Sequence, residues 1–280
     1  MRVPTLVDIG ANLAHDSFDA DRDAVLARAR AAGVAALVVT GSTLDDTDEA
    51  IALARRHPGM LRATAGVHPH HAAGLRDSDA GRLAELLRDP SVVAAGECGL
   101  DYFRNCSPPA EQRRAFELQL GLAAEAGKPL FLHQRDAHVD FLAMLRAHPQ
   151  AAARGVLHCF TGGPAELEDC LALGLAVGIT GWICDARRGQ ALRESAALVP
   201  RERVMIETDA PYLLPRTLVP KPPHRRNEPA FLPAVLAETA RCRNEDPAAL
   251  AAATTANACR FFGLTLAPSG IGSDGASELV

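Results

Sequence analysis

The sequence predicts an α/β protein that folds as a TIM (β/α)8 barrel. Eight short apolar runs alternate with helical patterns along the chain, and parallel strands require such crossovers. Several runs end in an acid or a histidine, the position that reactive side chains take in a barrel. With 280 residues, 48% of them hydrophobic, the chain can bury the core of a one-domain barrel. An open doubly wound sheet is the alternative, but no Gly-x-Gly-x-x-Gly motif follows the first run to support a dinucleotide-binding version.

The predicted strands are apolar, and most are closed by glycine, proline or a polar residue: residues 6–10, 35–41, 63–67, 92–96, 129–132, 155–157, 175–180 and 204–208. The predicted helices are rich in Ala, Leu, Arg and Glu, and several begin at an acid or a proline: residues 21–32, 45–56, 79–88, 109–126, 137–147, 164–173 and 187–198. One barrel domain is therefore expected over residues 1–266. Residues 267–280, rich in Gly, Ser and Ala, have too little apolar content to pack and are expected to form a flexible tail.

Composition excludes several classes of protein. The net charge of −5 argues against a broad cationic groove, so a polyanion would have to be held locally. No window approaches the roughly 18 uncharged apolar residues that a membrane span needs, and no secretion signal is apparent. We therefore expect a cytoplasmic protein with no membrane partner, and a monomer. The seven cysteines include no Cys-x-x-Cys pair, which favours reduced, mostly buried thiols over disulfides or a zinc knuckle.

Reactive side chains follow the predicted strands at the points where the strands end. In chain order they are Asp8, Asn12, His68, His70, Glu97, His133, His158 and Asp209. A lone histidine is more often a hydrogen-bonded structural residue and a lone acid often caps a helix, but barrel closure would bring all of these side chains around one mouth. Imidazoles and carboxylates together suit a divalent metal ion. Glu97, His133 and His158 form the minimal predicted ligand set, and Asp209 is either a further ligand or the proton acceptor.

Eight motifs in order give the sequence a specific family resemblance. They are Asp-Ile-Gly-Ala-Asn-Leu, Ala-Gly-Val-His-Pro-His, Gly-Glu-Cys-Gly-Leu-Asp, His-Gln-Arg-Asp-Ala-His, Leu-His-Cys-Phe-Thr-Gly, Gly-Ile-Thr-Gly-Trp-Ile-Cys-Asp, Ile-Glu-Thr-Asp-Ala-Pro-Tyr-Leu-Leu-Pro-Arg and Arg-Arg-Asn-Glu-Pro, spread over residues 8–229. They resemble the TatD family of metal-dependent deoxyribonucleases. The resemblance implies a TIM barrel of the metallo-dependent hydrolase type, a divalent-metal site, and 3′ to 5′ exonuclease action on single-stranded DNA and RNA, with a role in DNA repair. It also implies that Glu97, His133 and His158 are metal ligands and that Asp209 is the acid after the last strand.

One motif departs from the family pattern. Many members carry His-x-His after the first strand as ligands for one of two metals, whereas this chain has Gly10 and Asn12 there. Glycine offers no ligand, and an asparagine amide offers a weaker neutral oxygen. We therefore expect one well-occupied metal, with a second site that is weak or filled only when substrate phosphate helps to bind the ion. The expected ion is Mg²⁺, with Mn²⁺ and Zn²⁺ as alternatives, and activity is expected because the pattern resembles one branch of the family.

Phosphodiester hydrolysis needs an activated water, stabilisation of charge on the phosphate and protonation of the departing sugar oxygen. Asp209 is the predicted general base, and His68 or His70 is the predicted proton donor or stabiliser of charge. The two histidines flank Pro69, so hydrogen bonds that stabilise a turn are their structural alternative.

Candidate substrate contacts lie mainly in loops that follow the later strands. The segment Lys-Pro-Pro-His-Arg-Arg-Asn-Glu-Pro is the clearest basic one, and Arg225 and Arg226 within it are candidate phosphate contacts because the guanidinium fork suits phosphate. Arg135 is a weaker phosphate candidate, Asn12 is a further polar contact, and Trp182 either stacks on a base or packs in the core. A solvated loop and ion pairs with helix acids are the alternatives for the arginines. So small an aromatic surface for stacking favours an enzyme that binds the end of a single strand.

Two other functions compete with the nuclease. A related metal-dependent amidohydrolase acting on a small molecule would want the His-x-His pair, which is absent here. A catalytically inactive barrel that serves as a binding protein is the alternative from another class, and the presence of all four acid and imidazole positions argues against it.

Overall fold

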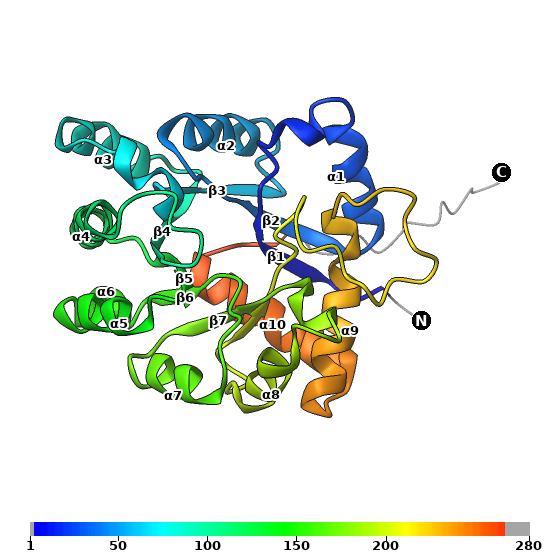
Figure 1. The fold of residues 1–280 in the computed structure, drawn as a ribbon. Coiled ribbons are helices and arrows are strands. Elements are labelled where there is room, and N and C mark those ends of the chain that lie inside the picture. The colour runs from blue at the N-terminus through cyan, green and yellow to red at the C-terminus, as the bar shows by residue number, and fades with distance from the viewer. Residues whose placement is uncertain (1–2, 267–280) are drawn as a thin grey trace, which may run out of the picture.

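Eight parallel strands form one sheet in the order β1 to β8, and helices surround them (Figure 1). The computed structural model describes residues 3–266. The strands are β1 Leu6–Ala11, β2 Val34–Val39, β3 Leu61–Ala65, β4 Val92–Asp101, β5 Leu130–Arg135, β6 Gly155–Leu157, β7 Ala176–Ile179 and β8 Val204–Ile206. The α-helices are α1 Arg22–Ala31, α2 Leu44–Arg56, α3 Ala80–Leu87, α4 Pro109–Ala126, α5 His138–Ala147, α6 Pro149–Ala152, α7 Pro164–Ala172, α8 Gln190–Leu198, α9 Leu232–Arg243 and α10 Pro247–Phe262.

The sheet closes where the segment after β8 meets β1. The Asp209 amide donates to the Gly10 carbonyl at 2.9 Å, and the Asn12 amide donates to the Ala210 carbonyl at 2.7 Å. Closure removes the free edges that an open sheet would leave. The predicted TIM barrel is therefore confirmed, and its first and last strands end side by side.

The barrel interior is filled by side chains from alternate strand positions, as expected for strands that are buried on both faces. This buried cluster draws on the strands and on α10: Val7, Ile9, Ala36, Val38, Ala94, Phe131, Val156, Ala176, Met205, Ala258 and Phe262. The Asn257 side chain donates to the Val204 carbonyl at the start of β8, and the Thr255 hydroxyl donates to the Thr5 carbonyl just before β1. Helix α10 therefore covers the N-terminal end of the barrel, and the opposite end is left for chemistry.

Several element bounds differ from the predicted ones by a few residues, among them β5, which continues past its predicted end at residue 132 to Arg135. Strand β4 continues beyond its predicted end at Gly96 to Asp101, because the backbone ladder with β5 runs on through Gly99 and Asp101. Helices α6, α9 and α10 were not predicted, although the seven predicted helices are all present.

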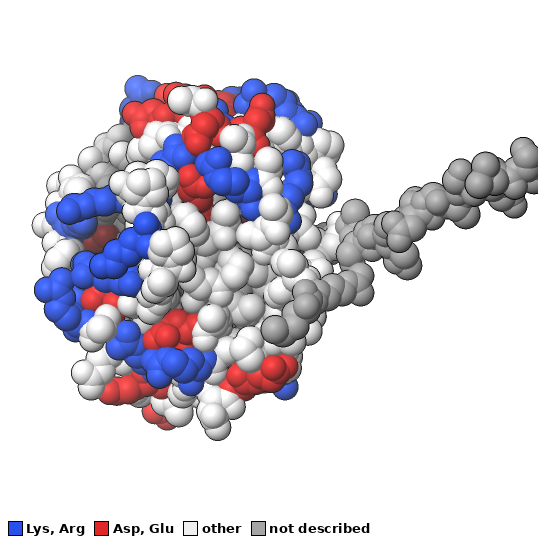
Figure 2. All heavy atoms as spheres, turned by 90° about the vertical axis from the view of Figure 1, so that its right-hand side faces the viewer, with Lys and Arg blue, Asp and Glu red and all other residues white. Residues whose placement is uncertain are grey.

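Charges of both signs are interspersed on the face shown in Figure 2, and neither forms a continuous field there. This distribution agrees with the net charge of −5 and with a polyanion being held locally. Among residues 3–266, no helix is long and apolar enough to cross a membrane. The predicted tail lies outside the described residues, so the domain boundary at residue 266 stays a prediction. The cytoplasmic location and the monomeric state also stay predictions.

Candidate metal centre and catalytic site

Three side chains meet at the C-terminal ends of neighbouring strands. His68 follows β3, Glu97 lies in β4 and His133 lies in β5, and one ligand atom of each is within 4.8 Å of the others. Glu97 Oε1 is central, because it lies 2.8 Å from His133 Nδ1 and 3.4 Å from His68 Nε2. The parallel pairing of β4 with β5, with Gly99 opposite His133, brings the glutamate and the histidine together.

His158 and Asp209 extend this group from the other side of the mouth. His158 Nε2 lies 3.8 Å from Glu97 Oε1 and 3.6 Å from Asp209 Oδ1. Asn12 donates from Nδ2 to the same Asp209 oxygen at 3.1 Å. We call this group the donor cluster, which consists of His68, Glu97, His133, His158 and Asp209. It brings together the four side chains predicted as metal ligands and adds His68, which was predicted only as a catalytic residue.

A buried carboxylate, Asp101, supports the histidines on one side. Its Oδ2 lies 3.1 Å from His133 Nε2 and 2.8 Å from His70 Nε2, so the His133 ring turns Nδ1 toward Glu97. Burial lowers the pKa of His133, but hydrogen bonds to Asp101 and Glu97 outweigh it and raise the pKa to about 9. Burial lowers the pKa of His68 to about 4. At neutral pH and without metal, His133 is therefore an imidazolium and His68 a neutral imidazole.

A second buried carboxylate, Glu207, orients His158. Its Oε2 lies 2.6 Å from His158 Nδ1, and its Oε1 accepts a bond from the Cys159 amide at 2.6 Å. With Nδ1 bound in this way, Nε2 of His158 faces the donor cluster, as in histidine ligands held by an outer carboxylate. Two glycines make room for Glu207, because a Cβ at Gly10 would lie 2.5 Å from Oε2 and a Cβ at Gly178 would lie 2.4 Å from Oε1. Glu207 thus fills the space beside the position where many family members carry a histidine.

Asp101 and Glu207 had no predicted role, although the sequence places each near a predicted site residue. Asp101 lies four residues after Glu97, and Glu207 lies two residues before Asp209. Even spacings along an extended strand place side chains on one face, so Asp101 shares a face of β4 with Glu97.

A third buried acid, Asp8, belongs to the closure of the barrel. It accepts bonds from the Thr208 amide at 2.9 Å and from the Thr208 hydroxyl at 2.6 Å. Burial raises the pKa of Asp8 to about 7 even though these bonds lower it. Asp8 therefore joins β1 to the segment that carries Asp209. Within residues 3–266, it makes no hydrogen bond to a side chain of the donor cluster.

The remaining predicted substrate contacts have different surroundings. Asn12 lies at the mouth, bound to Asp209. Arg135 ends β5, and its guanidinium carbon lies 5.2 Å from the ring centroid of the partly buried Trp182. Arg225 is exposed and has no ion-pair partner within the described part of the chain.

Arg226, a predicted phosphate contact, is engaged by acidic side chains. Its Nη2 lies 2.8 Å from both Asp21 Oδ2 and Glu228 Oε1. Arg28 contacts the same two acids, at 3.0 Å and 2.8 Å. This network joins α1 to the yellow segment before α9, which lies beside it in Figure 1. Because two carboxylates already compensate its charge, Arg226 is less available to a phosphate than the exposed Arg225, and its role as a phosphate contact stays a prediction.

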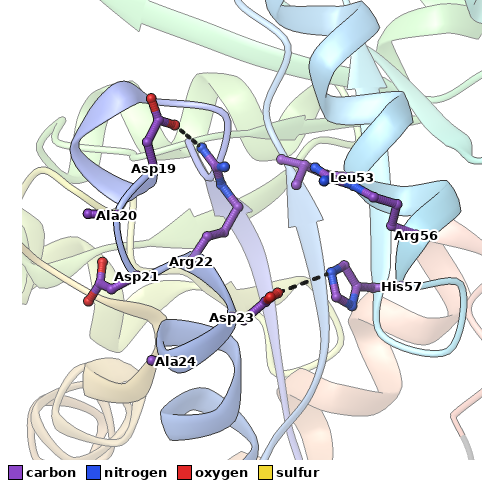
Figure 3. Close-up of a pocket in the computed structure, with 9 residues that line it drawn as sticks. All are labelled: Asp19, Ala20, Asp21, Arg22, Asp23, Ala24, Leu53, Arg56 and His57. Carbon is purple, nitrogen blue, oxygen red and sulfur yellow. Dashed lines mark hydrogen bonds and ion pairs between the residues drawn. The ribbon is translucent and has the colours of Figure 1, made fainter.

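The hollow drawn in Figure 3 contains none of the donor cluster residues. It measures about 460 Å³ and lies between the start of α1 and the end of α2. Two pairs of its side chains contact each other, Arg22 with Asp19 at 2.6 Å and His57 with Asp23 at 3.7 Å. Another hollow, of about 550 Å³, is lined in part by His70 and so adjoins the site.

The donor cluster fits a divalent metal ion. It offers three imidazoles and two carboxylates, a mixed set of nitrogen and oxygen donors. The imidazole nitrogens of His68, His133 and His158 all lie within 3.8 Å of one buried carboxylate oxygen, Glu97 Oε1. The nearby Cys159 is unsuited as a ligand, because burial raises the pKa of its thiol to about 12.

The sequence matches known proteins over nearly its whole length. The family model described as TatD related DNase matches residues 7–263. A protein named 3′-5′ ssDNA/RNA exonuclease TatD from Erwinia tasmaniensis is 51% identical over 259 residues, which are 92% of this chain and 100% of that protein. A protein of the same name from Cronobacter turicensis is 53% identical over 257 residues, which are 92% of this chain and 97% of that protein.

Solved structures agree with these matches. YJJV, a TatD homolog from Escherichia coli K12, has a TM-score of 0.86 and 28% identity, and the match covers 94% of this chain and 100% of that one. A hydrolase TatD family protein from Entamoeba histolytica has a TM-score of 0.85 and 25% identity, with coverage of 94% and 99%. With the family model and relatives above half identical both spanning the barrel, the chain belongs to the TatD-related DNase family.

Proposed function

We propose that this protein is a metal-dependent 3′–5′ exonuclease that hydrolyses phosphodiester bonds in single-stranded DNA and RNA. The convergence of Glu97, three histidines and Asp209 at the open end of a TatD-family barrel carries this proposal. The names of the relatives above half identical support the direction of cleavage and the substrate class. A part in DNA repair stays a prediction.

Glu97, His133 and His158 are the proposed ligands of a single Mg²⁺ ion, with Mn²⁺ and Zn²⁺ as alternatives that the imidazoles also suit. When bound, such an ion polarises the phosphate and makes a nearby water more acidic. Burial opposes ionisation of Glu97, but the surrounding imidazoles hold the pKa of its carboxyl well below its usual range. Glu97 is therefore available as an anionic ligand at neutral pH.

Asp209 is the proposed general base. Asn12 holds one of its oxygens at 3.1 Å, and the side chain is 15% exposed, so a water molecule can reach the carboxylate from the mouth. His70, 30% exposed and 2.8 Å from Asp101, is placed to hand a proton to the departing sugar oxygen. His68, buried and neutral, is placed to stabilise charge on the phosphate.

Asp209→Asn tests this assignment of roles. Single-stranded oligonucleotides labelled at either end are incubated with Mg²⁺, and again after chelation. We expect the 3′ label to be released first, chelation to stop the reaction, and Asp209→Asn to lower turnover by about 10²–10⁴-fold while metal affinity is largely retained.

The control is Asp23→Asn, which makes the same chemical change on a side chain that is 93% exposed. Near-normal turnover in Asp209→Asn would remove Asp209 from the mechanism. Activity that survives chelation would refute metal dependence, and release of the 5′ label first would refute the direction of cleavage.

A further inference from the structure

Beside the donor cluster, an arginine is held by aromatic rings. Arg135 ends β5, and its guanidinium carbon lies 5.0 Å from the ring centroid of Phe103, which follows β4, and 5.2 Å from that of Trp182, which follows β7. Arg188 packs on the same indole at 4.4 Å, and its carbonyl accepts the indole N–H at 3.2 Å. Contacts within about 6 Å attract a cation to the ring face. We call Phe103, Arg135, Trp182 and Arg188 the arginine–aromatic cluster.

Acidic side chains compensate the charge of Arg135 less fully than they compensate the charge of Arg226. Within residues 3–266, the one acid near its guanidinium is Asp136, with 3.8 Å between Nε and Oδ1. Its Nη1 donates to the neutral hydroxyl of Thr161 at 3.1 Å. Arg226, by contrast, lies 2.8 Å from two carboxylates. Rings and a hydroxyl therefore hold Arg135 in place while its charge stays available to an anion.

Phe103 exposes 59% of its surface beside this cation. A large apolar ring left open to water at the mouth of a barrel offers a face on which a nucleobase can stack, and every base has such a face. Trp182 is more buried than Phe103 and is fixed by Arg188. The exposed ring is thus Phe103, and the indole serves to hold Arg135.

The arginine–aromatic cluster and the donor cluster are adjacent, because each contains a residue of β5. Arg135 is two residues past His133 on β5, so the two side chains share a face and start roughly 6.6 Å apart along the strand. The guanidinium is therefore placed for a phosphate next to the one held in the donor cluster.

We propose that the arginine–aromatic cluster is a nucleotide subsite, in which Arg135 binds the backbone phosphate adjacent to the reacting one and Phe103 stacks on a base. This inference rests on the proposed function, because it states how that nuclease holds its single strand. A guanidinium and one ring face recognise the backbone and any base, so the subsite explains binding of a strand end without a preferred sequence.

Trp182 makes binding at this subsite directly visible, because it is the single tryptophan of the chain. Asp209→Asn protein loaded with Mg²⁺ is titrated with a short oligothymidylate while the tryptophan emission is recorded. We expect a saturable change in emission. In the same background, Phe103→Leu should raise the dissociation constant by roughly 5- to 150-fold, the range that stacking on one base supports. Arg135→Gln should raise it by roughly 10- to 150-fold, the range for hydrogen bonds to a charged group.

The salt dependence separates the two roles. Each phosphate contact with a single strand contributes about 0.7 to the slope of log affinity against log salt. Arg135→Gln should therefore lower the slope by about 0.7, whereas Phe103→Leu should leave it unchanged. Arg146→Gln removes a charge elsewhere, and Leu198→Ala trims a side chain that is also 59% exposed, so neither control should alter affinity.

Unchanged tryptophan emission at saturating oligothymidylate would overturn the inference, as would a parental salt slope in Arg135→Gln. Thermal unfolding identifies any variant that fails to fold. Phe103→Leu changes an exposed side chain, so it keeps the inference testable even where Arg135→Gln is unstable. A wild-type protein that shows these binding results but cleaves no oligonucleotide would refute the proposed function and leave the subsite intact.

Discussion

Replacing Glu207 by glutamine should weaken metal binding without changing any proposed ligand. Glutamine has nearly the same shape, but its amide presents one acceptor where the carboxylate presents two. The carboxylate receives a bond from His158 Nδ1 and another from the Cys159 amide, both at 2.6 Å. The NH₂ group of the glutamine must therefore face one of these two donors, and the orientation of His158 is no longer fixed.

The size of the effect follows from the burial of the site. Glu207 is fully buried, and a buried donor that loses its acceptor costs about 1–3 kcal/mol. Loss of the outer partner of a histidine ligand lowers metal affinity by about 10–100-fold, which corresponds to about 1.4–2.8 kcal/mol. The first figure applies to the stability of the metal-free protein, and the second applies to its metal affinity. The midpoint of thermal unfolding should fall by about 2–4 °C for each kcal/mol lost.

Calorimetric titration with Mn²⁺ measures the affinity, and thermal unfolding of the metal-free protein measures the stability. Asp8→Asn is the matched control, because it makes the same carboxylate-to-amide change on a fully buried acid that is bonded to Thr208. We expect Mn²⁺ to bind Asp8→Asn as it binds the wild type. Wild-type affinity in Glu207→Gln would refute the assignment of His158 as a ligand oriented by Glu207.

Three further predictions concern the ion and pH. Elemental analysis of the substrate-free protein should find a single metal ion per chain, because Gly10 offers no ligand and Glu207 fills the space beside it; two ions per chain would contradict this. The affinity for Mn²⁺ should rise with pH through about 9, because the ion must displace a proton from His133, whose pKa is raised to about 9, and another from His158, whose pKa is raised well above its usual range; an affinity independent of pH in calorimetry would rule this out. The Asp8 carboxyl has a pKa of about 7 in the folded protein against an ordinary value of 3.8, so its contribution to stability is present below 3.8 and is lost as pH rises through about 7. Asp8→Asn should therefore gain stability relative to the wild type over that range, and parallel curves of unfolding midpoint against pH would disprove it.

Much of the fold could be predicted because each barrel strand is buried on both faces and appears in the sequence as a short apolar run. The extension of β4 to Asp101 could not, because glycines and acids interrupt the apolar pattern there and backbone bonds to β5 define the strand. Helices α9 and α10 were also missed, because the alternation of strand and crossover helix ends with the eighth strand.

The location of the site could be predicted from one rule, that parallel strands bring their C-terminal ends to one rim. The partners of the site residues could not, because they come from distant parts of the chain. Glu207 lies 49 residues from His158, and Asp21 lies 205 residues from Arg226. The basic segment therefore suggested a phosphate contact at Arg226, since the acids that neutralise it lie largely elsewhere in the sequence.

The close fit of Glu207 against Gly10 has a consequence for how such sites evolve. A chain that gains a histidine at position 10 must shift the end of the Glu207 side chain, since even a methyl group there would lie 2.5 Å from its Oε2. Loss of the carboxylate first leaves His158 without its anchor, and gain of the histidine first creates this close contact. The residues at positions 10 and 207 are therefore coupled, because a change at either one alters the room or the contacts of the other.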